Sequence, residues 1–442
     1  MGRPVVVDLF AGAGGISLGF EQAGFDVAAA VEIDPVHAAV HAFNFPQTAV
    51  LARSVVGLKG AEIRHAAGLG DSQVDVVVGG APCQGFSLIG QRILDDPRNR
   101  LVLEFVRIVT ELDARYFVFE NVKGLTLGKH RRFLEELVRA FQLAGYQVRT
   151  PWKVLNAADY GVPQSRERLI LLGAKVGETL PDYPTATTRA AGSSGMRAEG
   201  PSCREALADL PDAETFDALR RGDETVIDGM RQPSGYASEL RCTKLSDWHY
   251  GYRRAWDPMI LTSSARTGHS DISRRRFAST SPGLVEPISR FFRLPPAGVS
   301  NTLRAGTDGA RGAFTSPRPI HYLYARCITV REMARLHGFP DWFRLHVTKW
   351  HGARQVGNAV APPLARMIGG AILAAMRLKP SRPVEILALG AKQLLEFTVT
   401  QAADYWDVDR PVSRRDQKSG ARKRSQAETE ADLASFVRVA AE

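Results

Sequence analysis

The chain has 442 residues, of which 44% are hydrophobic and 24% charged, a composition typical of folded proteins and a length that predicts more than one domain. It contains no signal peptide and no apolar run long enough to span a bilayer, so we expect a cytoplasmic protein with no membrane partner. The four cysteines are far apart and form no CxxC pair, which argues against a zinc site or a disulfide framework and predicts no bound metal.

The net charge of +10 is unevenly distributed. Residues 253–326 contain twelve arginines, four acidic residues and no lysine, and residues 410–424 carry a net charge of +6 in a polar segment that reads as a flexible, solvated tail. Arginine without lysine favours bidentate recognition of phosphates or guanine edges. The charge pattern therefore predicts a polyanionic partner.

The first predicted unit is a strand, a glycine-rich turn and a helix. Residues 4–10 (PVVVDLF) form an apolar run, the turn AGAGG follows, and a helical pattern begins near Ile16. The next apolar run ends at Glu32, where a carboxylate can accept both hydroxyls of a ribose, although an acid at a solvated strand end is the alternative. Position 17 is Ser, not the third glycine of a dinucleotide motif, so S-adenosylmethionine fits this turn better than NAD.

A second apolar strand, beginning at Val74, breaks at Gly79 and Gly80 and leads to Cys83. In open α/β sheets the ligand crevice lies outside the carboxyl ends of the strands, so this position makes Cys83 a candidate nucleophile. A buried structural cysteine is the alternative. The polar segment from Gln84 to Asn99 is expected to close over a substrate, and a helix should follow over residues 101–112.

Charged residues follow the next two predicted strands as well. The apolar run Tyr116–Phe119 ends at Glu120, which should lie at the same edge of the sheet as Cys83. Arg166 and Arg168 precede the strand at residues 169–173, and their spacing of two places them on one face, where they could stabilise negative charge. A solvated strand-end acid and an ordinary strand-edge charge pair are the alternatives.

The hydrophobic periodicity weakens from about residue 181 to 235, where a domain change is predicted. Short strands and turns are expected as far as residue 326. Helices are predicted at residues 329–338 and 364–376, the second of them opened by prolines. No internal repeat is present, and no function is assigned to the residues beyond about 380.

Six segments, in order, resemble the bacterial DNA (cytosine-5)-methyltransferases: DLFAGAGG (8–15), VEID (31–34), GGAPCQGFS (79–87), FENV (119–122), QSRER (164–168) and GNAVAPPLA (357–365). The resemblance implies an α/β fold in which a Rossmann-like, S-adenosylmethionine-dependent domain carries a smaller, irregular, mostly β target-recognition domain. The domains expected are a catalytic domain at 1–180 plus 350–380, a recognition domain at 181–326, a hinge at 327–349 and a C-terminal extension at 381–442.

The resemblance also implies a mechanism. Carbon-5 of cytosine is a poor nucleophile, and in this family a cysteine thiolate, here Cys83, adds to carbon-6 to activate it. Glu120 would hold or protonate ring N3, and Arg166 and Arg168 would hold the O2 side of the base. The methyl group would come from S-adenosylmethionine, and the target cytosine would be flipped out of the duplex.

Further site residues are implied by the same matching. Cofactor contacts are expected from Phe10, Gly12, Gly14, Glu32, Pro82, Leu101, Asn358 and Ala359. DNA contacts are expected from Gln84, Ser87, Arg98, Arg274, Arg275, Arg276, Thr302 and Arg304, although any single arginine is more readily a phosphate contact than a base reader. The family usually has an acid bonding the adenine amino group where this chain has Ser54, which predicts a weaker contact or a different residue there.

The expected partner is double-stranded DNA, with a restriction endonuclease acting on the same site as a further possibility, and the protein is expected to be a nucleoid-associated monomer. Three alternatives are open. A tRNA cytosine-5 methyltransferase has the same motifs, although the arginine-rich region favours duplex DNA. A non-catalytic DNA-binding protein would not need Cys83, Glu120, Arg166 and Arg168 together. A thiol hydrolase would need a histidine that no motif places near Cys83.

Overall fold

The computed structural model describes residues 2–82, 100–127, 130–307 and 316–410. All of these except Thr307 belong to one unit of the chain. Its main sheet has eight strands in the described residues, which are β1 (Val5–Leu9), β2 (Asp26–Val31), β3 (Ala49–Leu51), β4 (Val76–Gly79), β5 (Tyr116–Val122), β6 (Tyr146–Val148), β7 (Lys153–Asn156) and β8 (Glu167–Lys175).

The order of the strands is β3-β2-β1-β4-β5-β8-β6, with β7 also paired to β8. The five strands from β3 to β5 are parallel, whereas β8 is antiparallel to β5, β6 and β7. Because β8 runs the other way, its first residues lie at the carboxyl ends of β4 and β5. Arg168 pairs with Val122 in the β5–β8 ladder, two positions from Glu120. The topology thus brings the segment before β8 to the edge where Cys83 was predicted.

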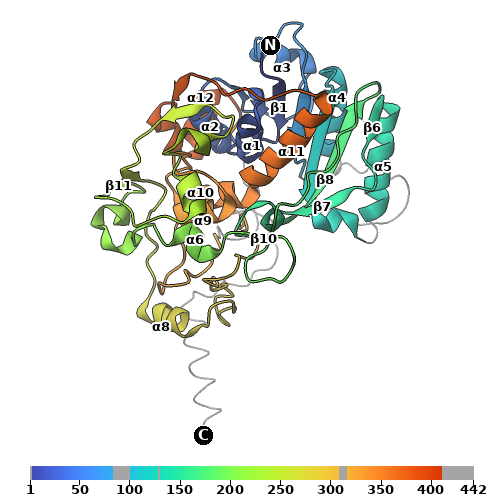
Figure 1. Cartoon of the computed structure of the whole chain (residues 1–442). Helices are drawn as coiled ribbons and strands as arrows, with labels where there is room; N and C mark the ends of the chain where they lie inside the picture. Colours follow the sequence, from blue (N-terminus) through green and yellow to red (C-terminus); the bar gives the residue numbers. More distant parts are fainter. Residues whose placement is uncertain (1, 83–99, 128–129, 308–315, 411–442) are drawn as a thin grey trace, which may run out of the picture. The chain divides into compact units, whose positions relative to one another are not determined.

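Helices α1 (Gly15–Ala23) and α11 (Pro362–Met376) pack on one face of this sheet, and α3 (Gly60–Ala66), α4 (Arg100–Glu111) and α5 (His130–Leu143) pack on the other, which explains the uninterrupted apolar strands. Three more helices, α2 (Pro35–Asn44), α9 (Val330–His337) and α10 (Lys349–Asn358), contribute to another apolar cluster. Figure 1 shows α11 beside α1, while α5 flanks the other side of the sheet. The predicted α/β fold, with a mainly parallel sheet, is confirmed.

Each face of the sheet has its own apolar cluster. Phe105 and Phe141, from α4 and α5, pack on Phe117 of β5, and the rings of Phe117 and Phe141 stack with centroids 3.7 Å apart. On the opposite face Phe20 of α1 packs with Ile368 of α11. The stretch Lys349–Met376 is long and apolar enough to cross a membrane by composition, but 61% of its most apolar window is buried, as in a core helix of a folded domain.

Between α5 and β8 the chain forms two short strands, β6 and β7, on either side of Pro151. Proline has no N–H to donate to a ladder, so the edge pairing with β8 is interrupted there. The interruption leaves the pairing of β8 with β5 intact.

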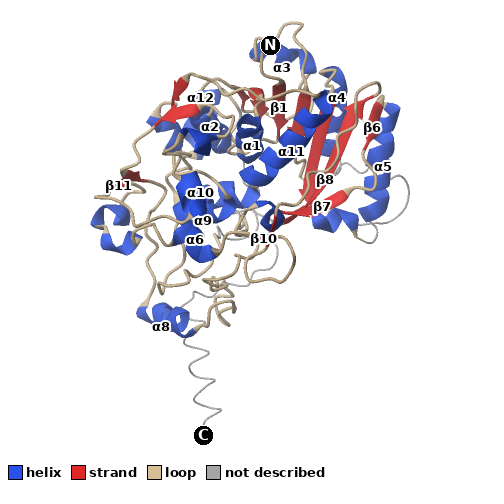
Figure 2. Cartoon of the chain, in the orientation of Figure 1, coloured by secondary structure: helices blue, strands red, loops and turns tan. Residues whose placement is uncertain are grey.

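The region between residues 181 and 326 contains less β structure than expected (Figure 2). Its described elements are β9 (Thr188–Arg189), β10 (Ala198–Glu199), α6 (Cys203–Leu207), η5 (Ala213–Thr215), η6 (Asp217–Arg220), β11 (Thr225–Val226), α7 (Gly235–Leu240), η7 (Leu245–Trp248), β12 (Arg253–Ala255), β13 (Ile260–Leu261) and α8 (Asp271–Ser279). These strands have two or three residues each, so the region is held by side-chain packing and by hydrogen bonds of turns.

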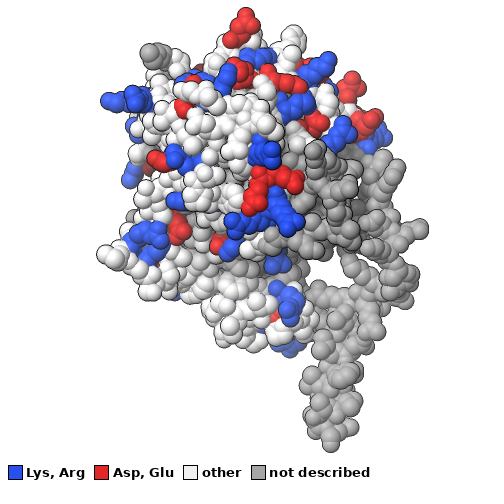
Figure 3. Space-filling model, turned by 90° about the vertical axis from the view of Figure 1, so that its right-hand side faces the viewer, with Lys and Arg blue, Asp and Glu red and all other residues white. Residues whose placement is uncertain are grey.

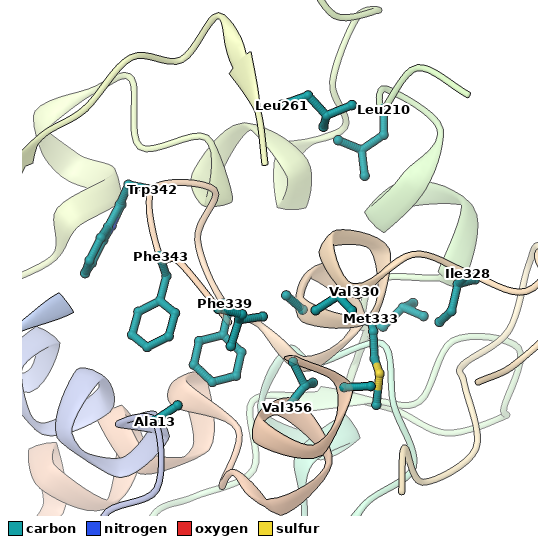
Figure 4. Close-up of a cluster of buried hydrophobic side chains, with 14 of the residues drawn as sticks. Ala13, Leu210, Leu261, Ile328, Val330, Met333, Phe339, Trp342, Phe343 and Val356 are labelled. Atoms are coloured by element: carbon teal, nitrogen blue, oxygen red, sulfur yellow. The ribbon is translucent and has the colours of Figure 1, made fainter. Parts of the chain in front are cut away.

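A third apolar cluster connects this irregular region to the rest of the chain (Figure 4). It includes Ala13 of the glycine-rich turn and Leu210 and Leu261 of the irregular region. It also includes Met333 of α9 and Phe339, which follows this helix. The same cluster contains Trp342, whose ring stacks on Trp248 with centroids 5.7 Å apart. The irregular region therefore shares a core with α9 and α10.

Candidate active site

The carboxyl ends of β4 and β5 meet where the chain leads toward Cys83. Asn121 of β5 is buried, and its Nδ2 donates a hydrogen bond to the carbonyl of Ala81 over 3.0 Å. A Cβ atom at Gly80 would lie 2.5 Å from Oε2 of Glu120, so a larger residue here would displace this carboxylate. Pro82 is exposed, and Cys83 itself lies outside the described residues. The segment that delivers Cys83 is thus fixed directly against Glu120.

Glu120 is paired with Arg168 at this edge. Nε of Arg168 lies 2.8 Å from Oε1 of Glu120, and both side chains are about six-sevenths buried, with 13% and 14% exposed. Burial raises the pKa of Glu120 above its ordinary value, an effect partly offset by the charges of Arg168 and Arg166. Nη1 of Arg168 donates to the carbonyl of Glu167. The pair therefore places the Glu120 carboxyl group, whose pKa is raised, beside the positively charged guanidinium of Arg168.

Arg166 has a different environment from Arg168. Its side chain is only 2% exposed and donates to three backbone carbonyls, those of Leu303, Gly357 and Ala359, over 3.1, 2.9 and 2.8 Å. Burial and the nearby charge of Arg168 lower the pKa of Arg166 to about 9. Instead of reaching into an open site, Arg166 joins the segment before β8 to two distant parts of the chain.

A buried amide and imidazole extend this junction. The Nε2 of Gln164 lies 2.9 Å from Nδ1 of His337, and the Oε1 of Gln164 accepts from the backbone N–H of Leu303. His337 Nε2 lies 3.0 Å from the carbonyl of Ala359, which also accepts from Arg166. Since a carbonyl can only accept, the imidazole must donate from Nε2 and accept at Nδ1. Burial lowers the pKa of His337 well below its ordinary value, which suits this neutral tautomer.

The glycine-rich turn after β1 has the geometry of a ligand cradle. Phe10 has φ 61°, which is rare for a non-glycine residue, and Gly12 and Gly14 also have positive φ, of 55° and 103°. A Cβ at Gly14 would meet the ring of Phe45 at 2.4 Å, whereas a Cβ at Gly12 would meet no heavy atom within 4 Å. Gly14 is therefore required for packing, and Gly12 borders open space.

Glu32 follows β2 and holds this turn. Its Oε2 accepts from the backbone N–H of Gly12 and its Oε1 from that of Asp34, each over 2.8 Å. Burial raises the pKa of Glu32 above its ordinary value. The segment at residues 358–360 comes to the same place, because a Cβ at Gly15 would lie 2.9 Å from Cβ of Ala359. Asn358 is exposed beside it.

Leu101 and Ser54 are two further positions expected near the cofactor. Leu101, near the start of α4, is half-buried against the cluster that covers one face of the sheet. The hydroxyl of Ser54 accepts from the backbone N–H of Val56 over 3.1 Å, so it stabilises its own turn. The roles of both residues toward the cofactor stay predictions.

A family model described as C-5 cytosine-specific DNA methylase matches residues 5–374, which is most of the chain. The chain belongs to this family. As the family's description names DNA and cytosine carbon-5, this finding supports a DNA (cytosine-5)-methyltransferase and not the tRNA enzyme or the non-catalytic binding protein.

This methylase is similar to type II methyltransferases of two bacteria. It is 55% identical over 430 residues to the type II methyltransferase M.XorII of Xanthomonas oryzae pv. oryzae, covering 95% of this chain and 99% of that one. It is 32% identical to the type II methyltransferase M1.HphI of Haemophilus parahaemolyticus, covering 83% and 86% of the two chains. The alignment with M.XorII is longer than the segment that the family model matches.

Solved structures show the same fold. A protein described as a DNA modification methyltransferase encoded within an E. coli prophage superposes on this methylase with a TM-score of 0.68 and 33% identity, covering 85% of this chain and 99% of that one. The S. pombe Dnmt2 methyltransferase, with a TM-score of 0.50 and 16% identity, covers 85% of this chain and 100% of its own and shares the fold.

The three arginines expected to contact DNA on α8 of the methylase are not equivalent. Arg274 forms two hydrogen bonds with the carboxylate of Glu214, over 2.9 and 2.7 Å. Arg276 is mostly buried, with its Nε 3.6 Å from Glu286. Arg275 is exposed and has no ion pair within the described residues. Only Arg275 is thus presented to a partner without first breaking an internal contact.

The other predicted DNA contacts lie on two segments. Thr302 donates its hydroxyl proton to the carbonyl of Ser165 over 2.7 Å, and Arg304 is exposed two residues further on. Because Leu303 between them is bonded to Gln164 and Arg166, Arg304 starts from a fixed backbone next to the catalytic segment. Gln84, Ser87 and Arg98 lie outside the described residues.

Sequence reasoning missed several polar residues of this site. Asp8 is fully buried, accepts a hydrogen bond of 2.6 Å from Ser17, and Ser17 in turn lies 3.0 Å from His41. Burial raises the pKa of Asp8 to about 7 and lowers that of His41 to about 3. An acid inside the apolar run PVVVDLF was the available signal for Asp8.

Ile33 is the other omission at the cofactor edge. It is 66% exposed, directly after Glu32. Its apolar side chain lies in solvent beside Glu32, the acid predicted to hold the ribose, where it could pack on a flat aromatic ligand such as adenine. The signal was an isoleucine in the polar turn VEID, and we consider Ile33 a candidate cofactor contact.

Proposed function

We propose that this methylase transfers a methyl group to carbon-5 of a flipped-out cytosine through a covalent bond between Cys83 and carbon-6 of the ring. The observation that supports it is the Glu120–Arg168 pair, fixed beside the Gly80–Pro82 segment that leads to Cys83. Addition of the Cys83 thiolate to carbon-6 forms the carbon–sulfur bond and moves an electron pair toward N3. A proton donor at N3 stabilises that charge.

Glu120 is suited to be this donor. Its pKa is raised by burial, so the carboxyl group keeps a proton to higher pH than an exposed glutamate does. Arg168 uses Nε for Glu120 and Nη1 for a backbone carbonyl, so its Nη2, which has no hydrogen-bond partner among the described residues, can donate to the cytosine O2. Arg166 acts as a positioning residue, because its hydrogen bonds go to backbone carbonyls.

The cofactor that fits the glycine-rich turn is S-adenosylmethionine, which supplies a methyl group on a positively charged sulfur. Glu32 can accept hydrogen bonds from the ribose hydroxyls, and Phe10 and Ile33 can pack on the adenine. The open space beside Gly12 can admit the methionine part of the cofactor. Asn358 and Ala359 approach the same turn from the C-terminal side. The methyl group would pass to carbon-5 as its bond to the cofactor sulfur breaks, which leaves S-adenosylhomocysteine. Loss of the carbon-5 proton to a base or water would then restore the C5–C6 double bond and release the Cys83 thiolate.

Residues 181–326 are proposed to read the DNA, with Arg275 and Arg304 as the arginines best placed to contact it. Flipping the cytosine costs a few kcal/mol, which contacts to phosphates and bases offset. Gln84, Ser87 and Arg98, which lie outside the described residues, are proposed to contact the flipped nucleotide. In this proposal residues 1–180 and 350–380 form the catalytic domain, residues 181–326 the recognition domain and residues 327–349 the hinge between them.

Type II methyltransferases accompany restriction endonucleases, and two relatives carry that name. We therefore propose that this methylase protects a short DNA sequence against an endonuclease that cuts the same sequence. Direct contact between the two enzymes is not required, since both need only bind the same site.

The test is bisulfite sequencing of DNA from cells that express the wild-type chain or the Cys83→Ala variant. We expect 5-methylcytosine at one position of one short sequence for the wild type and none for the variant, with the variant still binding DNA. Measurable turnover by Cys83→Ala would contradict the role of the thiolate, and methylation of tRNA in place of DNA would contradict the substrate.

A further inference from the structure

Residues 381–410 form a structured segment beyond the part of the chain that the family model matches. It contains β14 (Ile386–Ala388), η9 (Lys392–Leu395) and α12 (Val399–Trp406). Leu394, Leu395, Ala402 and Ala403 are buried, so the segment is an integral part of the fold. Figure 1 shows α12 beside α2, the helix that follows Glu32.

One end of this segment is attached to the recognition region. Three residues of β14 pair in parallel with β12, with Arg253 opposite Ile386. Lys392 forms an ion pair with Glu224, which also bonds Arg344. These contacts fix the segment to residues that precede α8.

The other end is attached to α2. The backbone N–H of Gly390 donates to the carbonyl of Phe43 over 2.8 Å, near the end of α2. At the start of α2, the indole Nε1 of Trp406 donates to the carbonyl of Pro35 over 3.1 Å. The segment therefore holds α2 at both ends.

The start of α2 is also the place where the cofactor-binding carboxylate is held. Pro35 is the first residue of α2, and Asp34 caps the helix by accepting from the backbone N–H groups of Val36 and His37. The backbone N–H of Asp34 donates to Oε1 of Glu32 over 2.8 Å. A short path of two neighbouring residues thus connects Trp406 to Glu32.

We propose that residues 381–410 act as a strap that fixes the amino end of α2, and that Trp406 is a positioning residue which holds Asp34 and Glu32 ready for the cofactor ribose. This inference rests on the proposed role of Glu32 in cofactor binding. A carboxylate held in its bound geometry before the ligand arrives avoids the loss of affinity that comes from ordering it on binding. The strap thereby increases cofactor affinity without touching the cofactor.

The test compares Trp406→Phe, which keeps an aromatic ring but removes the N–H, with Tyr405→Phe as a matched control. Tyr405 is the neighbouring aromatic residue, 52% exposed, with its ring 5.0 Å from that of Trp406. Binding of S-adenosylmethionine is measured by calorimetry on the full chain without DNA. We expect Kd to rise about twofold to tenfold for Trp406→Phe, the range that corresponds to one hydrogen bond, and not to change for Tyr405→Phe.

Two further measurements separate positioning from a merely structural role. The kcat at saturating cofactor should be unchanged in Trp406→Phe, while KM for the cofactor rises. Hydrogen exchange without cofactor should be faster at the amides of Val36 and His37, which Asp34 caps. Unchanged Kd together with unchanged exchange would overturn the role of the strap. A wild-type chain that does not bind S-adenosylmethionine would overturn the cofactor assignment itself, on which that role depends.

Discussion

The carboxyl edge of the main sheet and the recognition region are both rich in arginine, but they use it differently. At the sheet edge Arg166 is buried and donates to three backbone carbonyls, and Arg168 is mostly buried and paired with Glu120. In residues 253–326 most arginines also have partners inside the protein, namely Arg253, Arg254, Arg266, Arg274, Arg276, Arg293, Arg318 and Arg326. The described arginines there that are exposed are Arg275, Arg290 and Arg304.

This difference limits what a basic composition can teach about binding. An irregular region with short strands has few backbone ladders, so arginines supply many of the hydrogen bonds that hold its turns together. On the face shown in Figure 3, basic and acidic side chains are interspersed, with no single continuous basic area among the described residues. The DNA contacts are therefore expected from a few exposed arginines and not from all the arginines of residues 253–326.

The largest effect is expected at the sheet edge, from Glu120→Gln. The variant removes the group proposed to protonate N3, so kcat should fall by about a hundredfold to ten-thousandfold, the contribution of one positioned acid. Glu167→Gln is the matched control, because Glu167 is a half-exposed neighbour that pairs with Lys123 on the surface. Methyl transfer to DNA measures both. Activity of Glu120→Gln close to that of the control would contradict the assigned role.

The buried junction should be the next most sensitive place. Arg166→Lys substitutes a single ammonium group for the planar guanidinium that donates to three carbonyls. The loss of these contacts should misplace Arg168 and lower kcat by about tenfold to a hundredfold. Arg149→Lys is the control, since Arg149 also donates to two carbonyls, of Leu180 and Pro181, but away from the site. If both variants lose stability alike and neither loses kcat, Arg166 is structural only.

In the recognition region, Arg275→Ala and Arg274→Ala should separate a DNA contact from an internal one. Arg275→Ala is expected to weaken DNA binding severalfold and to lower the slope of log affinity against log salt by about one, as for a lost phosphate contact. Arg274→Ala leaves Glu214 unpaired and should mainly lower the melting temperature. Fluorescence anisotropy at several salt concentrations checks both. Equal salt slopes for the two variants would remove the distinction.

The last prediction concerns stability and not activity, and it is a pH dependence caused by Asp8, which is buried in the main sheet. The pKa of Asp8 is about 7 in the folded protein, against an ordinary value of 3.8, because the side chain is buried. The folded state therefore holds its proton more tightly than the unfolded state, and stability should fall as the pH rises from about 4 through 7.

Asp8→Asn should not show this fall. From pH 5 to pH 8 the unfolding free energy of the variant should therefore rise relative to that of the wild type by an amount on the order of a few kcal/mol. Denaturant titrations at the two pH values measure it, with Asp71→Asn on an exposed turn as the control. A difference between Asp8→Asn and the wild type that stays constant with pH would show that Asp8 does not titrate as expected.

The sequence was sufficient to predict the sheet edge. Glu120 and Arg168 each stand where an apolar run meets polar residues, and strand ends of an α/β sheet converge on one edge, so their proximity follows from pattern and topology. The segment at residues 357–365 was placed near the cofactor by resemblance, and Ala359 does lie against Gly15.

The junction and the recognition region could not be predicted in the same way. The bonds of Arg166 to Leu303 and of Gln164 to His337 join residues more than 130 positions apart, and no local pattern encodes such a pairing. The recognition region lacks the periodicity that reveals long strands or helices, so its short elements and the internal use of Arg274 emerged only from packing. The contacts of the strap could not be predicted for the same reason.

The most direct test of the mechanism is covalent capture on DNA that contains 5-fluorocytosine. The DNA is a fragment of several kilobases, amplified with 5-fluoro-deoxycytidine triphosphate in place of deoxycytidine triphosphate. A fragment of this length is expected to contain any short recognition sequence. With S-adenosylmethionine, we expect a protein–DNA complex that survives detergent and heat, whose linked peptide contains Cys83, and which Cys83→Ser does not form. Absence of this complex from a wild-type preparation that methylates ordinary DNA would contradict the thiolate mechanism.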